Sequence, residues 1–297
     1  MTDGRRRMVV TGQHGQVVQS LLERSRDDDR FNVVALGRPE LDLSVPDSIE
    51  AALKNARPDV IVSAAAYTAV DQAEAEEEAA TVINGVAAGK IATIAAKLNV
   101  PVIHLSTDYV FDGSKPAAYV ETDPVAPLGA YGRSKFAGEI AIAEAAPNHV
   151  ILRTAWVYSP FGKNFLKTML RLAEGRDSIN VVDDQVGNPT SALDIADGIL
   201  RIAINLVASD HPRLRGIFHM TGSGRASWAD FATEIFQVSA AQGGPFAEVG
   251  RIPSSAYPVP ARRPANSCLD CRKLLENHDV VLPDWQTSTA QVVDRLL

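Results

Sequence analysis

Cysteine is scarce in this chain: its 297 residues include only Cys268 and Cys271. A single C-x-x-C, with no second pair and no neighbouring histidines, lacks the four ligands of a structural zinc site. We therefore interpret both residues as reduced thiols. The six histidines are scattered without H-E-x-x-H or a similar spacing, so no metal site is predicted.

Excess positive charge and long apolar runs are also missing. The formal net charge is -7, which leaves no basic field for nucleic acid. No apolar run approaches the roughly 18–20 residues of a membrane span, and the start, Arg5-Arg6-Arg7-Met8-Val9-Val10, lacks the apolar core of a signal peptide. We expect a cytoplasmic protein with no nucleic-acid or membrane partner. Its 46% apolar and 22% charged residues are ordinary for a globular protein.

Short apolar runs alternate with helical patterns through the first half of the chain. Strands are predicted at 8–10, 31–36, 60–62, 102–105, 149–152 and, later, 217–220. Helices are predicted to follow the first strand through Leu22, and to occupy 48–55, 79–98 and the segment from Tyr131 to Ala146. Continuous apolar strands that alternate with helices are typical of a parallel sheet covered on both faces. The predicted fold class is therefore α/β, with a doubly wound, mostly parallel, Rossmann-like sheet.

The second half of the chain shows weaker patterns. Val181-Val182 begins a short strand, and Asp183 to Thr190 is expected to be an exposed polar loop. Ser191 and Ser227 are predicted helix N-caps. The segment 242–264 is rich in glycine and proline, and we expect it to form a loop-dominated lobe over the functional site.

A turn with two glycines, Gly12 and Gly15, follows the first strand, and Val18 stands where a third glycine would be expected. Glycines at a strand-to-helix turn let the backbone approach a pyrophosphate. A dinucleotide site and a plain tight turn both remain open. The second strand leads into Arg38, and an arginine at this point accommodates the 2′-phosphate of NADP. The sequence is equally compatible with a solvated arginine in a loop.

Further candidate contacts lie near the ends of other strands. Ala64-Ala65-Ala66 leaves room for a flat group against the backbone, and Asp42 can face an adenine amino group. Asn84 lies on the 79–98 helix. The acidic run from Glu74 to Glu78 is interpreted as the solvated first turn of that helix, where negative charge suits the helix dipole.

Tyr131 and Lys135 stand four residues apart at the start of a helix. On one face, the ammonium can favour the phenolate and lower the pKa of the phenol from about 10. With help from the positive ring of a bound cofactor, this predicts a proton donor poised near neutral pH. Thr107, at the end of the fourth strand, can align the same substrate oxygen. Taken alone, the pair is equally compatible with a solvated helix face.

Taken in order, these motifs resemble the extended short-chain dehydrogenase/reductase superfamily and, within it, the dTDP-4-dehydrorhamnose reductase family. The resemblance covers nearly the whole chain. The segments that carry it are Arg57 to Ile61, Ala64 to Asp71, Ser106 to Phe111, Pro127 to Lys135, Arg153 to Tyr158, Asp184 to Thr190, and Ser255 to Pro258 running into Arg263 to Ser267.

The resemblance implies reduction of the C4 ketone of dTDP-4-dehydro-L-rhamnose to dTDP-L-rhamnose, with NADPH or possibly NADH. It implies an NADP-binding domain of residues 1–155 with parts of 180–220, and a smaller substrate-binding lobe of 156–180 and 221–285. The implied catalytic residues are Thr107, Tyr131 and Lys135. The implied cofactor contacts are Gly12, His14, Gly15, Gln16, Val17, Arg38, Asp42, Leu43, Ala64, Ala65, Ala66, Tyr67, Asn84, Tyr131 and Lys135. The implied substrate contacts are Val70, Thr107, Asp108, Tyr109, Trp156 and Arg263, and core packing is the alternative for Trp156.

Two departures from the family pattern bear on binding and assembly. Val18 in place of glycine is expected to push the helix off the turn and to weaken pyrophosphate binding. Some family members form magnesium-bridged dimers through three glutamates, and here those positions hold Ser20, Leu193 and Arg295, which cannot ligate the ion. We expect a monomer or a metal-independent dimer.

Two other functions are compatible with the same motifs. One is a non-catalytic, NADP-binding regulatory subunit, like that of methionine adenosyltransferase. The other is a reductase of a different dehydro-sugar nucleotide. The intact Thr107, Tyr131 and Lys135 favour catalysis over the regulatory role, although retained motifs do not prove turnover.

Overall fold

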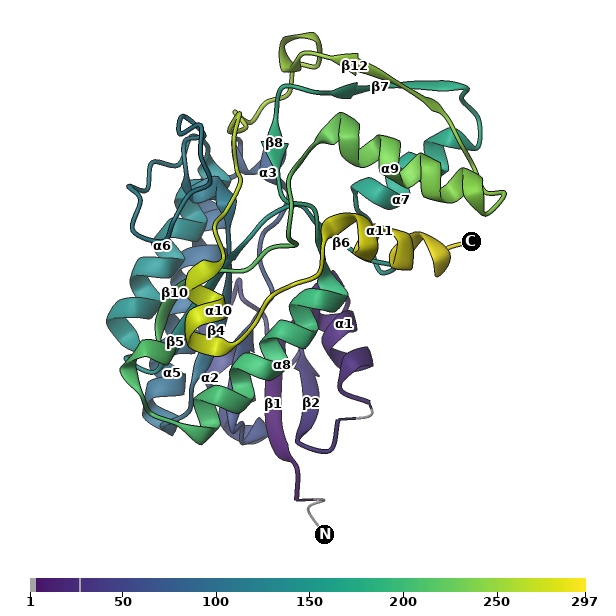
Figure 1. The fold of residues 1–297 in the computed structure, drawn as a ribbon. Coiled ribbons are helices and arrows are strands. Elements are labelled where there is room, and N and C mark those ends of the chain that lie inside the picture. Colours follow the sequence, from purple (N-terminus) through teal and green to yellow (C-terminus); the bar gives the residue numbers. More distant parts are fainter. Residues whose placement is uncertain (1–3, 27) are drawn as a thin grey trace.

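Six parallel strands form the centre of the molecule in the computed structural model, which describes residues 4–26 and 28–297 (Figure 1). Residues 1–3 and 27, within the first predicted domain, lie outside the described part. The strand order is β10-β5-β4-β3-β1-β2, and every pairing is parallel. The strands are β1 (Arg6–Thr11), β2 (Phe31–Leu36), β3 (Val60–Ser63), β4 (Val102–Thr107), β5 (His149–Thr154) and β10 (Gly216–His219).

Helices cover both faces of this sheet. Side chains alternate along β1: Met8 and Val10 join the core under α1 (Gln16–Arg24) and α8 (Ala192–Ala208). Val9 joins the opposite core under α2 (Pro46–Ala56) and α5 (Ala87–Leu98), beside α6 (Ala130–Ala145). Since both faces of each strand are buried, the strands are continuously apolar, and the predicted doubly wound fold is confirmed.

A smaller lobe with its own apolar core lies beside the sheet. It contains α7 (Phe165–Ala173), α9 (Trp228–Ala241), α11 (Trp285–Asp294) and a parallel pair of strands, β7 (Ser178–Val182) and β12 (Glu248–Ile252). The expectation that 242–264 is dominated by loops is therefore wrong for β12. The sequence of β12, EVGRI, did not predict a strand because Gly250 interrupts it. The strand forms because it pairs with β7, a tertiary contact that the local sequence does not reveal.

The prediction of an exposed polar loop at Asp183 to Thr190 is also wrong. This segment forms β8 (Val186–Gly187) and β9 (Thr190–Ser191), which pair with β11 (Ala226–Ser227) and β6 (Val157–Tyr158). Asn188 and Thr190 are buried. The polar side chain of Asn188 crosslinks backbones, because it donates to the Gly224 carbonyl and accepts from the Leu269 N–H. Ser191 and Ser227 do cap α8 and α9, and Ser227 forms a full capping box.

The helical run Glu77–Leu98 combines α4 (Glu77–Thr81), a π-helical turn η1 (Val82–Val86) and α5. Within the described residues it is the one helix long and apolar enough, by length and composition, to cross a membrane. Half of its most apolar window is buried, and it packs against α2 and α6. The remaining short elements are α3 (Val70–Ala73), α10 (Arg272–His278), and the 3-10 turns η2 (Asp108–Val110), η3 (Pro212–Leu214) and η4 (Ser254–Ala256).

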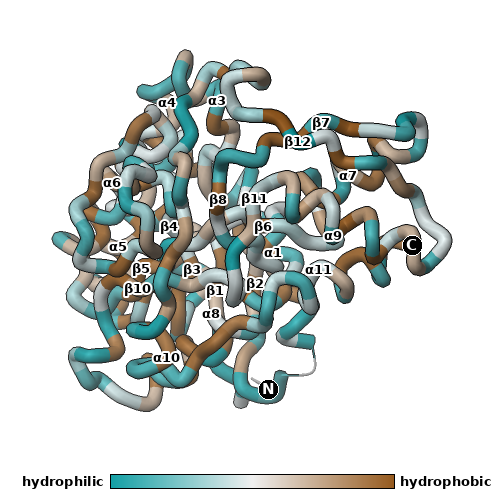
Figure 2. Tube along the Cα trace, turned by 45° about the horizontal axis from the view of Figure 1, so that its top comes forward, coloured by the Kyte–Doolittle hydropathy of each residue, from teal (hydrophilic) through white to brown (hydrophobic). Residues whose placement is uncertain are grey.

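The strand order defines where a ligand binds. β1 lies between β2 and β3, so the chain reverses direction across the sheet at β1 and β3. In open α/β sheets, ligands occupy the crevice outside the carboxyl ends of the strands at such a switch point. Apolar segments follow the inner strands and the lobe core, whereas hydrophilic segments cover much of the periphery (Figure 2).

Candidate active site

A cleft of about 640 Å³ opens over the carboxyl ends of β1, β3 and β4. It brings together the three predicted catalytic residues, Thr107, Tyr131 and Lys135. The predicted cofactor and substrate contacts that also line it are Gly12, His14, Gly15, Gln16, Val17, Ala64, Ala65, Ala66, Val70, Asp108, Tyr109 and Trp156.

A second cavity of about 530 Å³ adjoins the first and shares Gly12, His14, Ala65 and Ala66 with it. The predicted residues that line only this cavity are Arg38, Asp42 and Leu43. The two cavities form one elongated groove across the switch point, with the catalytic residues at one end and Arg38 at the other.

Gly12 stands where the two cavities meet, and its φ of 101° lies in the region that favours glycine. A Cβ at Gly12 would lie 3.3 Å from Val18 Cγ2 and 3.4 Å from Ala65 Cβ, so a side chain here would be tightly packed as well as strained by the positive φ. Val18 is buried beneath the turn. The residues present fit the close backbone approach that a dinucleotide requires.

Three predicted site residues do not line either cavity. Asn84 is buried behind the cleft, where its Oδ1 accepts the Tyr67 N–H at 2.8 Å and its Nδ2 donates to Ser134 Oγ at 3.0 Å. Tyr67 turns its hydroxyl to Glu76. Arg263 pairs with Asp71 at 3.0 Å, and its buried Nε has no hydrogen-bond partner in the described part of the chain.

Close packing of the first turn of α6 places Tyr131. A Cβ at Gly132 would overlap the Tyr109 carbonyl oxygen, so glycine allows α6 to lie directly against η2. Glu74 accepts the Ala130 N–H at 2.8 Å, and Glu77 pairs with Arg133. The glutamates of Glu74 to Glu78 are all exposed, as the sequence predicted, and two of them, Glu74 and Glu77, also hold the start of the Tyr131 helix.

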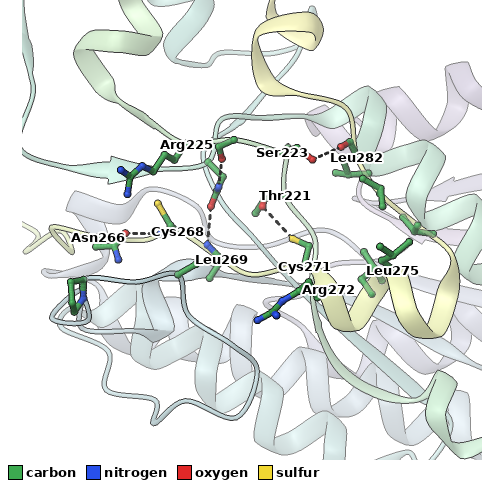
Figure 3. A pocket seen from close by; sticks show the side chains of 18 residues that line it. Thr221, Ser223, Arg225, Asn266, Cys268, Leu269, Cys271, Arg272, Leu275 and Leu282 are labelled. Atoms are coloured by element: carbon green, nitrogen blue, oxygen red, sulfur yellow. Dashed lines mark hydrogen bonds between the residues drawn. The ribbon is translucent and has the colours of Figure 1, made fainter.

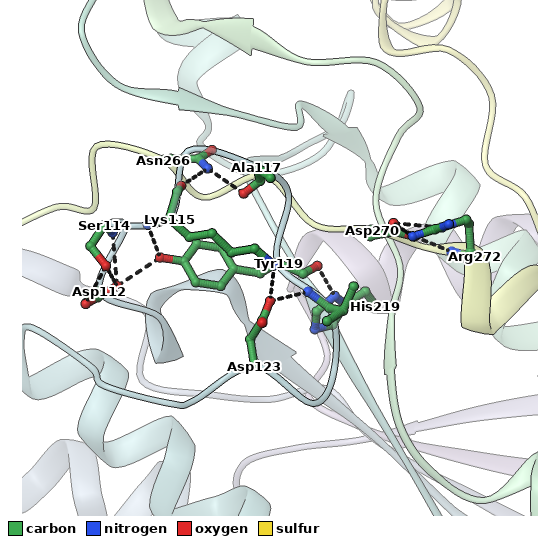
Figure 4. A network of polar contacts seen from close by, with 11 residues as sticks. Asp112, Ser114, Lys115, Ala117, Tyr119, Asp123, His219, Asn266, Asp270 and Arg272 are labelled. Atoms are coloured by element: carbon green, nitrogen blue, oxygen red, sulfur yellow. Dashed lines mark hydrogen bonds and ion pairs between the residues drawn. The ribbon is translucent and has the colours of Figure 1, made fainter.

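The loop before α6 is tied to the segment that carries Asn266 (Figure 4). Asn266 Nδ2 donates to the carbonyls of Lys115 and Ala117, and Tyr119 forms a bridge with Leu269. The Tyr119 hydroxyl donates to Asp112 at 2.8 Å. The loop before α6 is thus held to the C-terminal part of the chain.

Burial controls the protonation of the catalytic pair. Desolvation, with a smaller contribution from the negative charge of Asp108, raises the pKa of Tyr131 to about 12. Burial lowers the pKa of Lys135 to about 8. The Lys135 ammonium donates to the Leu105 carbonyl at 2.6 Å and faces His104 Nε2 at 3.2 Å. Burial therefore raises the pKa of the Tyr131 phenol in this geometry, and the predicted lowering, which also needs the positive ring of a bound cofactor, stays a prediction.

Asp108 lies beside the same phenol. Burial raises its pKa to about 6, although hydrogen bonds from Ser267 and Thr107 oppose the shift. Thr107 Oγ1 donates to Asp108 Oδ1 at 2.9 Å. A hydrogen bond with Thr107 also acts to lower the pKa of Tyr131. The threonine hydroxyl therefore lies between the tyrosine and the aspartate.

Trp156 forms part of the cleft wall and is held by a second indole. Its ring stacks on Trp228 with centroids 3.6 Å apart and 4° between planes. Phe165 also packs against Trp228, with ring centroids 4.7 Å apart. The backbone of Trp156 has a φ of 47°, which is unusual outside glycine. The Trp156 ring thus packs against the lobe core and also lines the cleft, and its contact with the substrate stays a prediction.

Sequence reasoning missed part of the cleft wall. The missed residues are Val18, Thr68, Leu105, Ser106, Thr154, Ala155, Val157, Gly162 and Lys163, together with Gln13, Gly37, Leu41, Ser44 and Ile83 in the second cavity. Gln16 also links the glycine turn to the lobe, because its Oε1 accepts from Ser159 Oγ at 2.8 Å and from Asn164 Nδ2 at 2.9 Å. Most of the missed residues are sequence neighbours of predicted site residues, and that adjacency was the available signal.

Both thiols line a separate cavity of about 470 Å³, away from Tyr131 (Figure 3). Cys268 is buried and points toward Arg225, whereas Cys271 Sγ lies 3.4 Å from Thr221 Oγ1. Both are free cysteines, as interpreted from the sequence. Within residues 4–26 and 28–297, no group of three or more His, Cys, Asp or Glu side chains is placed to hold a metal ion.

A glycine turn at the switch point of a parallel sheet, with a Tyr-Lys pair and a threonine hydroxyl at the end of the same groove, defines an NAD(P)-dependent oxidoreductase of the short-chain dehydrogenase/reductase type. Residues 6–297 match the family model described as the RmlD substrate binding domain. The chain belongs to this family, and relatives that match it over most of their length are named dTDP-4-dehydrorhamnose reductase.

The relatives match over nearly their full length. The chain is 50% identical to the dTDP-4-dehydrorhamnose reductase of Sinorhizobium fredii, over 98% of both proteins. It is 43% identical to that of Escherichia coli K12, over 86% of this chain and 85% of the relative. The crystal structure of the Bacillus anthracis enzyme in complex with NADP superposes with a TM-score of 0.90 at 31% identity, over 98% of this chain and 99% of that chain.

Proposed function

We propose that this protein reduces the C4 ketone of dTDP-4-dehydro-L-rhamnose to give dTDP-L-rhamnose, with NADPH as the reductant. The observation that carries the proposal is the convergence of Thr107, Tyr131 and Lys135 at one end of the switch-point groove. The nearly full-length match to reductases of this name supports the same substrate.

NADPH, when bound, supplies the hydride. Tyr131 then holds the proton that the new hydroxyl needs, because a phenol with a pKa of about 12 stays protonated at neutral pH until an alkoxide demands its proton. Thr107 aligns the same oxygen, and the cationic form of Lys135 stabilises negative charge that develops on the phenol. Burial at this end of the cleft strengthens each interaction.

The groove offers separate positions for the two halves of the cofactor. Gly12, His14, Gly15, Gln16 and Val17 would hold the pyrophosphate at the start of α1, where the helix N-terminus favours negative charge. Arg38 lines the far cavity, where a 2′-phosphate would distinguish NADPH from NADH. The NADP complex of the Bacillus anthracis relative supports this preference.

The substrate would lie against the lobe. Val70, Asp108, Tyr109 and Trp156 line the cleft on the side of Tyr131, and we propose that they contact the sugar. Arg263 lies outside both cavities and pairs with Asp71, so it would reach the nucleotide part of the substrate only after this pair rearranges. This arrangement supports division into an NADP-binding domain, 1–155 with parts of 180–220, and a substrate lobe, 156–180 with 221–285. We place the enzyme in the cytoplasm as a monomer or metal-independent dimer.

A different dehydro-sugar nucleotide is the second candidate. A Streptomyces antibioticus relative, 37% identical over 98% of this chain and 96% of its own length, is named a probable dTDP-4,6-dihydroxy-2-methyloxan-3-one 4-ketoreductase. The name of this relative supports a different ketone as the alternative substrate.

The deciding experiment follows NADPH oxidation at its near-ultraviolet absorbance, with enzymatically generated dTDP-4-dehydro-L-rhamnose. NADH and other 4-dehydro-sugar nucleotides are tested in parallel. Rapid oxidation that depends on the named sugar supports the proposal and ranks the two cofactors. Faster oxidation with another sugar moves the assignment to that substrate. NADPH binding without oxidation of any sugar favours the regulatory-subunit function.

A further inference from the structure

His104 is a buried histidine that neither the glycine turn nor the Tyr-Lys motif accounts for. It lies on β4, three residues before Thr107, and only 1% of its surface is exposed. Its register partner on β3 is Ser63, which is buried as well. His104 and Ser63 are polar side chains on two apolar central strands, so both need hydrogen-bond partners. One partner of His104 is the catalytic Lys135.

The hydrogen bonds form a short chain from the cleft into the sheet. Lys135 Nζ donates to the Leu105 carbonyl at 2.6 Å and lies 3.2 Å from His104 Nε2. His104 Nδ1 lies 3.0 Å from Ser63 Oγ. The side chains of Lys135, His104 and Ser63 are all buried, and Lys135 is the one of these three that also lines the cleft.

Charge determines the direction of these hydrogen bonds. Burial and then the neighbouring Lys135 charge hold the pKa of His104 well below its usual value, so the imidazole is neutral. A neutral ring that accepts from an ammonium at Nε2 carries its proton on Nδ1. That proton is then donated to Ser63 Oγ.

We propose that His104 is a positioning residue for Lys135. Its Nε2 and the Leu105 carbonyl take two of the three ammonium protons and leave one for the cleft. His104 does not reach substrate or cofactor and acts only through Lys135. This proposal rests on the catalytic role given to Lys135 in the proposed function.

The acceptor also favours the charged form of Lys135. The other charged groups nearby are Glu139, whose charge raises the pKa of Lys135, and Arg153, which is paired with Glu139. His104 is the neutral acceptor in this set. Its removal leaves the ammonium one hydrogen bond short, so the pKa of Lys135 falls further.

The test compares His104→Leu, which has no acceptor, with His104→Gln, whose amide oxygen can reach the Nε2 position. In His104→Leu, we expect kcat to fall by about 10- to 100-fold and the basic limb of the kcat/KM pH profile to move about one pH unit lower. His104→Gln should restore both within a few-fold. His278→Leu is the matched control, because it removes a buried imidazole whose polar contacts are the Leu214 carbonyl and the Asn205 side chain, neither of which is part of the Lys135 site.

Nuclear magnetic resonance provides a readout that needs no turnover. Carbon-13-labelled lysine reports the pKa of Lys135 in each variant, and nitrogen-15-labelled histidine reports the tautomer in the wild-type protein. We expect the Nδ1–H tautomer of His104 at about pH 6–7, where Lys135, with a pKa of about 8, is charged and can donate to Nε2. An Nε2–H tautomer, or a Lys135 pKa unchanged in folded His104→Leu, would overturn the proposal. If the wild type reduces no sugar, the proposed function fails, and these two measurements still decide the positioning role.

Discussion

Burial sets the protonation states of the two residues at the catalytic end of the cleft. Tyr131, with a pKa of about 12, remains a phenol across the physiological range. Lys135, with a pKa of about 8, begins to lose its charge just above neutrality. The phenol is therefore always available as a donor, and the lysine is the group whose titration limits activity.

Tyr131→Phe should lower turnover by about two to four orders of magnitude, because it removes the general acid and leaves the ring in place. Cofactor affinity should stay nearly intact, since the glycine turn and Arg38 are unchanged. Steady-state kinetics and NADPH fluorescence titration measure the two quantities. Tyr119→Phe is the control: its hydroxyl binds Asp112 outside the cleft, so turnover should remain near wild type. Wild-type turnover in Tyr131→Phe would exclude this residue as the donor.

The pH dependence of kcat/KM should show a basic limb near pH 8. Lys135 acts in its protonated form, and burial lowers its pKa to about 8, so the active fraction falls as pH rises through that value. The loss approaches about tenfold per pH unit above it. Lys135→Arg keeps a cation at high pH and should remove this limb, although its maximum rate should be lower. A limb that persists unchanged in Lys135→Arg belongs to another group.

At the scale of elements, a buried ion pair joins α6 to β5. Glu139 and Arg153 are 2% and 1% exposed, and two hydrogen bonds of 2.9 and 2.7 Å connect them. Ser106 Oγ also donates to Glu139 at 2.5 Å. Glu139 lies one turn beyond Lys135, so this pair anchors the catalytic helix to the sheet.

Glu139→Gln should destabilise the protein by about 3–5 kcal/mol, because the Arg153 guanidinium would stay buried without its counter-charge. Chemical denaturation measures the free energy of unfolding. Glu77→Gln is the matched control: it breaks the α4–α6 pair with Arg133, which is 44–46% exposed, and should cost less than about 1 kcal/mol. Equal losses in the two variants would show that the buried pair has no special role in stability.

The sequence predicted the elements whose signals are local. Continuous apolar runs located β1 to β5, and Ser191 and Ser227 marked the starts of α8 and α9. β12 was missed because its stability comes from β7, about 70 residues earlier in the chain. The stack of Trp228 on Trp156 and the capping of α6 by Glu74 were missed for the same reason, since both join segments far apart in sequence.

At the scale of the whole molecule, contacts between the sheet domain and the lobe pass close to the cofactor turn. Gln16, the first residue of α1, holds Ser159 and Asn164 through its side-chain oxygen. Asn164 in turn caps α7, where its Oδ1 accepts the Lys167 N–H at 3.1 Å. The side-chain amide of Gln16 therefore connects the glycine turn to the lobe. This connection explains why residues of both the turn and the lobe line the cleft.

Assembly should not depend on magnesium. Ser20 is buried and donates to the Gln16 carbonyl, Leu193 is buried in the lobe core, and Arg295 pairs with Glu23 at 2.7 and 2.9 Å. A hydroxyl already in use, an alkyl chain and a paired guanidinium offer no carboxylate oxygens to the ion. Sedimentation velocity at several protein concentrations should therefore give the same mass in EDTA and in millimolar magnesium. Arg295→Ala removes the cation that would repel magnesium but adds no ligand, so the mass of this variant should also be the same with and without magnesium. A dimer that appears only with magnesium would contradict this account.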